Sequence, residues 1–182
     1  MKVLFAILVA VAAVPVVAAA LPIRSSAEAP TDSPNLRLQK LAGTWDAVVV
    51  MNGPDGVEQR TRGTLITTRL ADFHTLDTFR GQVMGGEFVG HGTNGYCPVR
   101  GKYFSFWTDA LSATPMTLFG DYDAKKRELV MKGECLGMSG KLEPCRTVTR
   151  FVDEDHRTWT LFGAGPDGAE IQHVRIEYSR AQ

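Results

Sequence analysis

Apolar and polar residues alternate along most of the chain after Gly43, a pattern typical of strands with one face in a core and the other in solvent. The last stretch is the clearest, because Val174, Ile176 and Tyr178 share one face while charged and polar residues occupy the other. The pattern predicts an all-β chain with ten strands, at residues 44–51, 61–69, 73–80, 86–96, 102–108, 115–122, 128–135, 145–152, 157–163 and 170–180.

Turn sequences separate these stretches. Gly53-Pro54-Asp55-Gly56 and Gly165-Pro166-Asp167-Gly168 each combine a proline that sets φ with a glycine that accepts a positive φ. The other connections are also short, so successive strands are expected to be antiparallel neighbours. A ten-stranded antiparallel meander would expose two edges unless it closed on itself. We therefore predict a ten-stranded antiparallel closed barrel over residues 36–182.

A short amphipathic segment precedes the first strand. Leu36, Leu38 and Leu41 alternate with polar residues at helical spacing, and Gly43 ends the pattern. We predict one or two turns of helix that cap one end of the barrel.

The N-terminus has the composition of an export signal. Residues 1–20 contain one cation, Lys2, then an apolar run that ends in Ala18-Ala19-Ala20, the small-residue pattern that signal peptidase reads. An uncleaved membrane anchor is the alternative, although no basic stop-transfer cluster follows. Residues 21–35 are rich in Pro, Ser and Ala and are interpreted as a flexible linker. We expect a secreted or periplasmic protein without stable membrane insertion after cleavage.

The charge balance narrows the range of partners. The chain has 20 basic and 20 acidic residues, and loss of Lys2 with the signal would leave 19 basic ones. No basic stripe or cationic tail interrupts this balance. The sequence therefore lacks the electrostatic footprint that nucleic acids or anionic membrane surfaces require.

Six short motifs resemble those of a known family: Leu41-Ala42-Gly43-Thr44-Trp45, Gly92-Thr93-Asn94-Gly95-Tyr96, Trp107-Thr108-Asp109, Gly120-Asp121-Tyr122-Asp123, Gly165-Pro166-Asp167-Gly168 and Tyr178-Ser179-Arg180. Together they are similar to an uncharacterised bacterial family of secreted lipocalin-like proteins, catalogued only as a domain of unknown function. The resemblance implies a lipocalin- or calycin-like barrel and supplies no catalytic residues. The chain departs from the family pattern at Cys97 and between Cys135 and Cys145.

Gly43, Trp45 and Arg180 are predicted to form a latch at one barrel end. Arg180 continues the inward face of the last strand, and ten alternating strands bring that strand's end beside the start of the first. A guanidinium stacked on an indole contributes roughly 0.5–2 kcal/mol. The alternative is that Arg180 frays into solvent near the C-terminus.

The three cysteines are expected to lie at different barrel ends. Counting strand directions places Cys97 at the Trp45 end, whereas Cys135 and Cys145 flank one hairpin loop at the other. Only the latter two can meet without distorting the fold. We predict a Cys135–Cys145 disulfide, which would stabilise by roughly 2–3 kcal/mol, and a free Cys97 thiol.

No residue pattern indicates catalysis. The histidines fall in separate strands or turns without metal-ligand spacing, so we expect no metal and no cofactor; His91 is the first position to examine for a haem. Nucleophile elbows, phosphate loops and dinucleotide fingerprints are absent from the sequence. Asp109 and Asp121 end successive antiparallel strands, which places them at opposite barrel ends and excludes a carboxylate dyad.

The candidate ligand-binding residues are Trp107 with Asp109, Arg146 with Arg150, and Tyr96. Alternation does not determine which faces of two strands point inward. Trp107 and Asp109 compete with the more apolar face of Phe104 and Phe106. Arg146 and Arg150 compete with the face that carries Thr147, Thr149 and Phe151, and on the outside they would be ordinary surface charges.

We predict that the barrel binds a small apolar or amphipathic molecule in its interior. Aromatic residues supply the apolar contact, and a few charged side chains supply polar anchors. The alternatives are an isomerase- or cyclase-like enzyme that uses the same cavity, and a structural envelope module with a filled core. The sequence leaves the ligand and the oligomeric state open.

Overall fold

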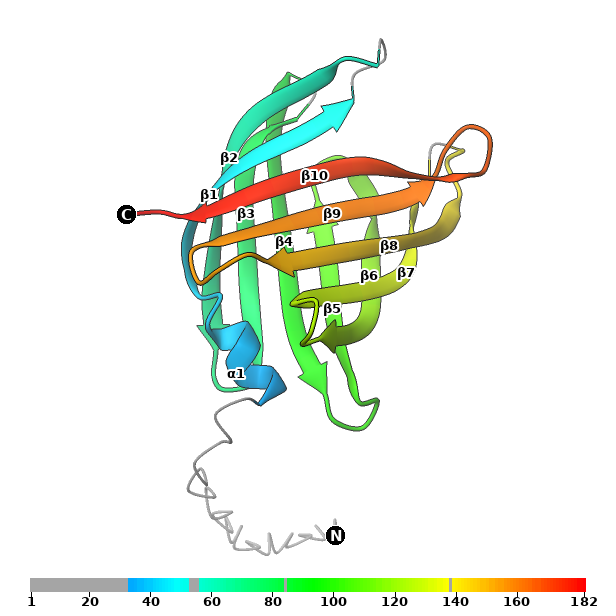
Figure 1. Ribbon diagram of the computed structural model, residues 1–182. Helices are drawn as coiled ribbons and strands as arrows, with labels where there is room; N and C mark the ends of the chain where they lie inside the picture. Colours follow the sequence, from blue (N-terminus) through cyan, green and yellow to red (C-terminus); the bar gives the residue numbers. More distant parts are fainter. Residues whose placement is uncertain (1–32, 53–55, 84, 138) are drawn as a thin grey trace, which may run out of the picture.

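The structure is a computed structural model that describes residues 33–52, 56–83, 85–137 and 139–182. The predicted signal peptide, most of the predicted linker and the tip of the first hairpin turn lie outside these residues. The described chain contains one short helix and ten strands (Figure 1): α1 (Pro34–Gln39), β1 (Gly43–Asn52), β2 (Glu58–Leu70), β3 (His74–Val83), β4 (Gly86–Cys97), β5 (Lys102–Asp109), β6 (Ser112–Asp123), β7 (Glu128–Leu136), β8 (Leu142–Phe151), β9 (His156–Ala164) and β10 (Glu170–Arg180).

The strands form a closed antiparallel barrel, which confirms the predicted fold. Each strand pairs with its neighbours in sequence, and β1 closes the sheet by pairing with β10. In the closing register Trp45 stands opposite Arg180, and Ala47 stands opposite Tyr178. Closure gives each described strand a hydrogen-bonded neighbour on both sides, so the sheet lacks the two open edges that a flat meander would expose.

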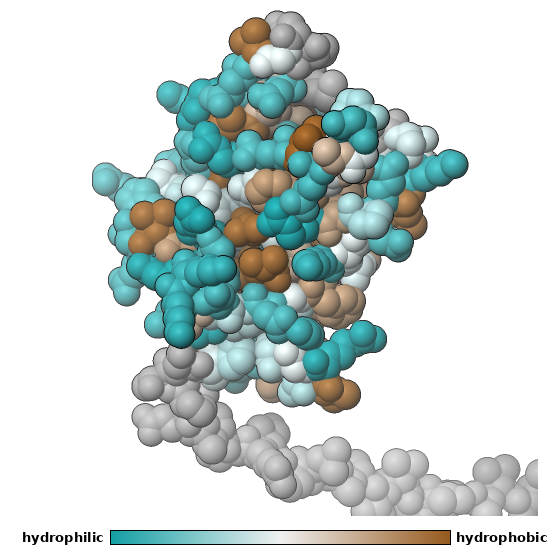
Figure 2. Space-filling view, turned by 45° about the vertical axis from the view of Figure 1, so that its right-hand side comes forward, coloured by the Kyte–Doolittle hydropathy of each residue, from teal (hydrophilic) through white to brown (hydrophobic). Residues whose placement is uncertain are grey.

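The inward faces carry the bulk of the apolar side chains. Trp45, Ala47 and Val49 of β1 are buried at 1–3% exposure, whereas Asp46 between them is exposed. On the side shown in Figure 2 the outer surface is mostly hydrophilic, with hydrophobic patches set among polar residues. The alternation of the sequence therefore translates directly into an inside and an outside.

Two ambiguous strands are resolved by the structure. On β5, Trp107 and Asp109 line the interior, while Phe106 is 42% exposed on the outer surface. On β8, Thr147 and Thr149 are buried inside the barrel. On β5 the inner face is thus the one that carries Trp107 and Asp109, and on β8 it is the one that carries the threonines rather than the arginines.

Helix α1 lies at one end of the barrel (Figure 1), as predicted. Ser33 caps it by accepting a hydrogen bond from the Leu36 amide at 3.2 Å, and Pro34 occupies the first turn, where no amide is needed. Leu38 is buried against the barrel core, and the Gln39 side chain donates to the Ala71 carbonyl at 2.9 Å. We call this the helix end of the barrel and the opposite one the far end.

No helix in the described part of the chain is long and apolar enough to cross a membrane.

Candidate ligand-binding cavity

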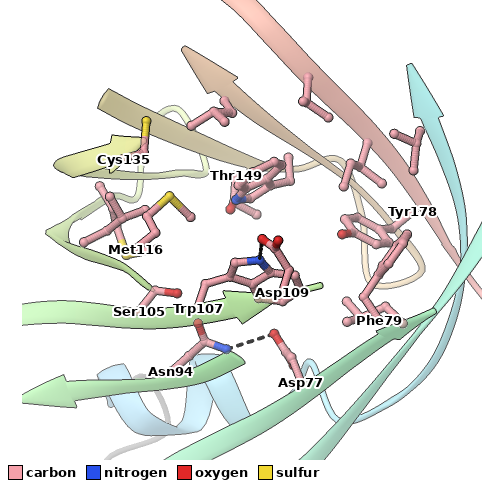
Figure 3. Close-up of a pocket in the computed structure, with 18 of the residues that line it drawn as sticks. Asp77, Phe79, Asn94, Ser105, Trp107, Asp109, Met116, Cys135, Thr149 and Tyr178 are labelled. Atoms are coloured by element: carbon pink, nitrogen blue, oxygen red, sulfur yellow. Dashed lines mark hydrogen bonds between the residues drawn. The ribbon is translucent and has the colours of Figure 1, made fainter. Parts of the chain in front are cut away.

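The barrel encloses a cavity of about 370 Å³. Most of the side chains that line it are aliphatic or aromatic, among them Phe88, Met116 and Leu161. Polar side chains interrupt this wall at two places, one around Asp109 toward the far end and one around Asp77 toward the helix end (Figure 3). The volume falls within the range of roughly 300–1,000 Å³ that small-molecule sites occupy.

Trp107 and Asp109 form the polar site toward the far end. The indole Nε1 of Trp107 donates to Asp109 Oδ2 at 2.9 Å, and the Leu111 amide donates to Oδ1 at 2.9 Å (Figure 3). The indole lies flat over Gly90 and Gly92 of β4, where a Cβ at Gly90 would overlap with its ring. Two of the glycines that enrich β4 therefore provide the space in which Trp107 stands.

Tyr96 does not line the cavity in the described structure. Its ring packs edge-on against Tyr103, with ring centroids 5.2 Å apart, and joins the core cluster at the helix end. Tyr96 therefore packs in the core at the helix end and does not face the cavity. This corrects the sequence-based prediction that Tyr96 contacts a ligand directly.

Arg146 and Arg150 also lie away from the cavity, because the inner face of β8 is the threonine face. Arg146 donates to Glu170 at 3.0 Å and stacks on Phe162 at 4.0 Å, while Arg150 donates to Glu128 at 2.9 Å. All of these contacts are on the outer surface. Of the two orientations that the sequence left open, the interior position of these two arginines is therefore wrong and the surface position is the observed one.

Trp45 lies at the helix end, and two guanidinium groups stack on it. Arg180 lies 4.2 Å and Arg157 lies 4.0 Å from its ring centre. Arg180 also donates to the Ala42 carbonyl at 3.1 Å and to Asp155 at 3.0 Å. Gly43 has a φ of +135°, and a side chain there would press on the Arg180 guanidinium.

A polar side chain inside the barrel at the helix end was missed by the sequence analysis. Asp77 accepts a hydrogen bond from Thr67 Oγ1 at 2.6 Å and another from Asn94 Nδ2 at 2.9 Å. Burial raises the pKa of Asp77, while the hydrogen bond from Thr67 and the charge of Arg157 oppose that rise. Both Asp77 and Arg157 lie on inward faces next to an aromatic residue, Asp77 two positions before Phe79 and Arg157 two positions before Trp159. A charge on such a face is the signal that could have found them.

Arg157 and Tyr178 complete this group. The guanidinium of Arg157 is only 6% exposed and lies 5.0 Å from the Tyr178 ring centre. Burial lowers the pKa of Arg157 and raises that of Tyr178, because each loses hydration of its charged form. The charge of Arg157 opposes the rise in the pKa of Tyr178, but burial outweighs it.

The cysteines are free thiols in this structure, so the predicted Cys135–Cys145 disulfide is not formed. Cys145 stands opposite Gly133 and Cys135 opposite Glu143, which makes the two cysteines a diagonal pair. Their thiols are neighbours, with a side-chain hydrogen bond between Cys135 and Cys145. Burial, together with the neighbouring Cys135 thiol, raises the pKa of Cys145 to about 12.

The described residues include no cluster of three or more potential metal ligands. His91 is exposed on the outer surface beside Thr78, away from the cavity, so the structure offers no support for a haem there. Asp121 is exposed and paired with Lys102, whereas Asp109 lies at the other end of the β5–β6 pair. These two carboxylates are therefore separated, as the strand order requires.

Comparison with protein families gives a match over residues 31–180 to the family described as "Protein of unknown function (DUF1579)". The chain belongs to this family. No curated protein matches the sequence.

Two solved structures show the same fold. Rv2717c from M. tuberculosis superposes with a TM-score of 0.64 and 15% identity, over 82% of this chain and 99% of that one. The S-type phycobiliprotein lyase CPES from Guillardia theta superposes with a TM-score of 0.58 and 9% identity, over 84% and 94% of the two chains. At these identities the likeness concerns the fold, which is the lipocalin-like barrel.

Proposed function

We propose that this DUF1579 protein binds one small apolar or amphipathic molecule inside its barrel. The observation that carries the proposal is the cavity of about 370 Å³, whose wall is mostly apolar and whose polar groups are few and converge on two places. A structural module with a filled core would not retain such a space.

Binding of a neutral fluorescent probe tests this proposal. N-phenyl-1-naphthylamine should gain fluorescence on addition of the protein and saturate at one molecule per chain. Native mass spectrometry of protein purified from its own host should show a bound mass that denaturation releases. Absence of both signals would contradict a binding function and favour the structural-module alternative.

Catalysis in the same cavity is the second hypothesis that these experiments address. Two acidic side chains that line the cavity, Asp109 and Asp77, accept hydrogen bonds from Trp107 and Asn94. A ligand recovered unchanged from the protein supports binding. Recovery of a converted product, with conversion lost in Asp109→Asn, would favour an enzyme.

Export is the other part of the proposal. It rests on the Lys2 head, the apolar run and Ala18-Ala19-Ala20. N-terminal sequencing of the protein from its own host should begin just after Ala20. An intact Met1 in the membrane fraction would instead indicate an uncleaved anchor.

A further inference from the structure

Arg157 has a donor without a partner inside the barrel. Its Nη1 is buried and makes no hydrogen bond within the described residues. A buried N–H without an acceptor is costly, and a charged one more so, which makes such groups rare in folded proteins. Arg157 also lines the cavity at the helix end, where an acceptor carried by a ligand could reach its guanidinium.

The nearby carboxylate does not fill this need. Asp77 attracts Arg157 electrostatically, but its two oxygens already accept hydrogen bonds from Thr67 and Asn94. No ion pair between Asp77 and Arg157 is present in the described structure. Arg157 is held instead by stacking on Trp45 and Tyr178, which fixes its guanidinium without occupying all its donors.

We propose that Arg157 binds the carboxylate of an amphipathic ligand whose apolar chain extends along the cavity toward the far end. This inference rests on the proposed binding function and names its ligand class. A planar guanidinium pairs well with a carboxylate, and Tyr178 lies at the same end with its ring directed toward the cavity (Figure 3). A singly charged head group is favoured over a phosphate dianion, because Asp77 would repel the second charge.

The charges at the two ends set the ligand's orientation. Asp109 lies toward the far end and would repel a carboxylate placed there. Between the ends the wall is apolar, with Met116, Leu118 and Ile176 among the lining residues. The acid head therefore lies toward Arg157, and the hydrocarbon chain contacts this wall.

The test compares ligands of one chain length that differ only in the head group. Dodecanoate, dodecanol, methyl dodecanoate and dodecylamine are used to displace N-phenyl-1-naphthylamine from the wild-type protein. We expect dodecanoate to bind about tenfold more tightly than the alcohol or the ester, as a charge-assisted hydrogen bond implies. Equal binding of acid and alcohol would overturn the inference but leave the binding function standing. Preference for dodecylamine would overturn it in favour of Asp77 as the anchor.

Variants then locate the head group. Arg157→Gln should remove the advantage of dodecanoate and leave dodecanol binding unchanged. Arg80→Gln, an exposed arginine on β3, is the matched control and should leave the advantage intact. Because Arg157 is buried, its variant could fail to fold, and Tyr178→Phe is the second variant, expected to reduce the advantage in part. Failure of the wild-type protein to bind the probe or any of the four ligands would contradict the proposed function itself.

Discussion

The guanidinium of Arg180 lies 4.2 Å from the centre of the Trp45 ring and joins the last strand of the barrel to the first. The same side chain donates to the carbonyls of Ala42 and Lys40, so it also holds the segment that links α1 to β1. We expect Arg180→Ala to lower the free energy of unfolding by about 1–2 kcal/mol, the modest value reflecting its partial exposure. Urea unfolding followed by tryptophan emission measures the loss in free energy of unfolding, and the emission spectrum of the folded variant reports the changed environment of the indole.

Arg80→Ala is the control for this latch, since Arg80 is an exposed strand arginine. It should leave both stability and emission close to those of the wild type. If Arg180→Ala unfolds at the same urea concentration with the same spectrum, the contact contributes nothing in solution.

Trp107 is expected to contribute most of the aromatic contact with a ligand toward the far end. Replacement by Ala removes the indole and frees Asp109, so binding of a neutral probe should weaken by about tenfold, equivalent to about 1.4 kcal/mol. Phe106→Ala on the same strand is the matched control, because Phe106 is 42% exposed on the outer surface. Equal losses in the two variants would show that the probe does not enter the barrel.

Asp77 predicts a specific pH dependence of stability. Its pKa in the folded protein is raised above the ordinary value, so folding favours the protonated form. The stability that protonated Asp77 contributes is fully present at low pH and is lost as the pH rises through the folded-state pKa. The free energy of unfolding then falls by up to about 1.4 kcal/mol per pH unit. Stability relative to Asp77→Asn should therefore fall between acidic and neutral pH.

Urea unfolding of both proteins across this pH range provides the measurement. Asp121→Asn, which alters an exposed carboxylate, reports the effect of a general change in net charge. A wild type that gains stability over Asp77→Asn as the pH rises would mean that the hydrogen bond from Thr67 and the attraction to Arg157 together outweigh burial.

The cysteines should behave as three thiols. Alkylation of the denatured protein without reductant is expected to modify Cys97, Cys135 and Cys145. In the folded protein at neutral pH, Cys145 should react slowly, because it is buried and its pKa is raised to about 12. A single modified residue after denaturation would instead demonstrate the Cys135–Cys145 bond.

The sequence alone determined the strands, their antiparallel order and the closure of the barrel. These follow from local features: alternation with a period of two, turn residues between the stretches and connections too short for anything but hairpins. The juxtaposition of Trp45 and Arg180 also follows, because strand number and parity place the two chain ends of the barrel together.

Only the tertiary structure decided what lies inside. A period of two defines two faces of a strand but not which one points inward. On β5 the face with Phe106 is the outer one, and on β8 the face with the two arginines is the outer one. Arg157 and Asp77 come from strands far apart in the sequence, and their proximity depends on how the closed sheet curves. Whether space remains at the centre depends on the summed volumes of side chains from all ten strands, a quantity that no local pattern contains.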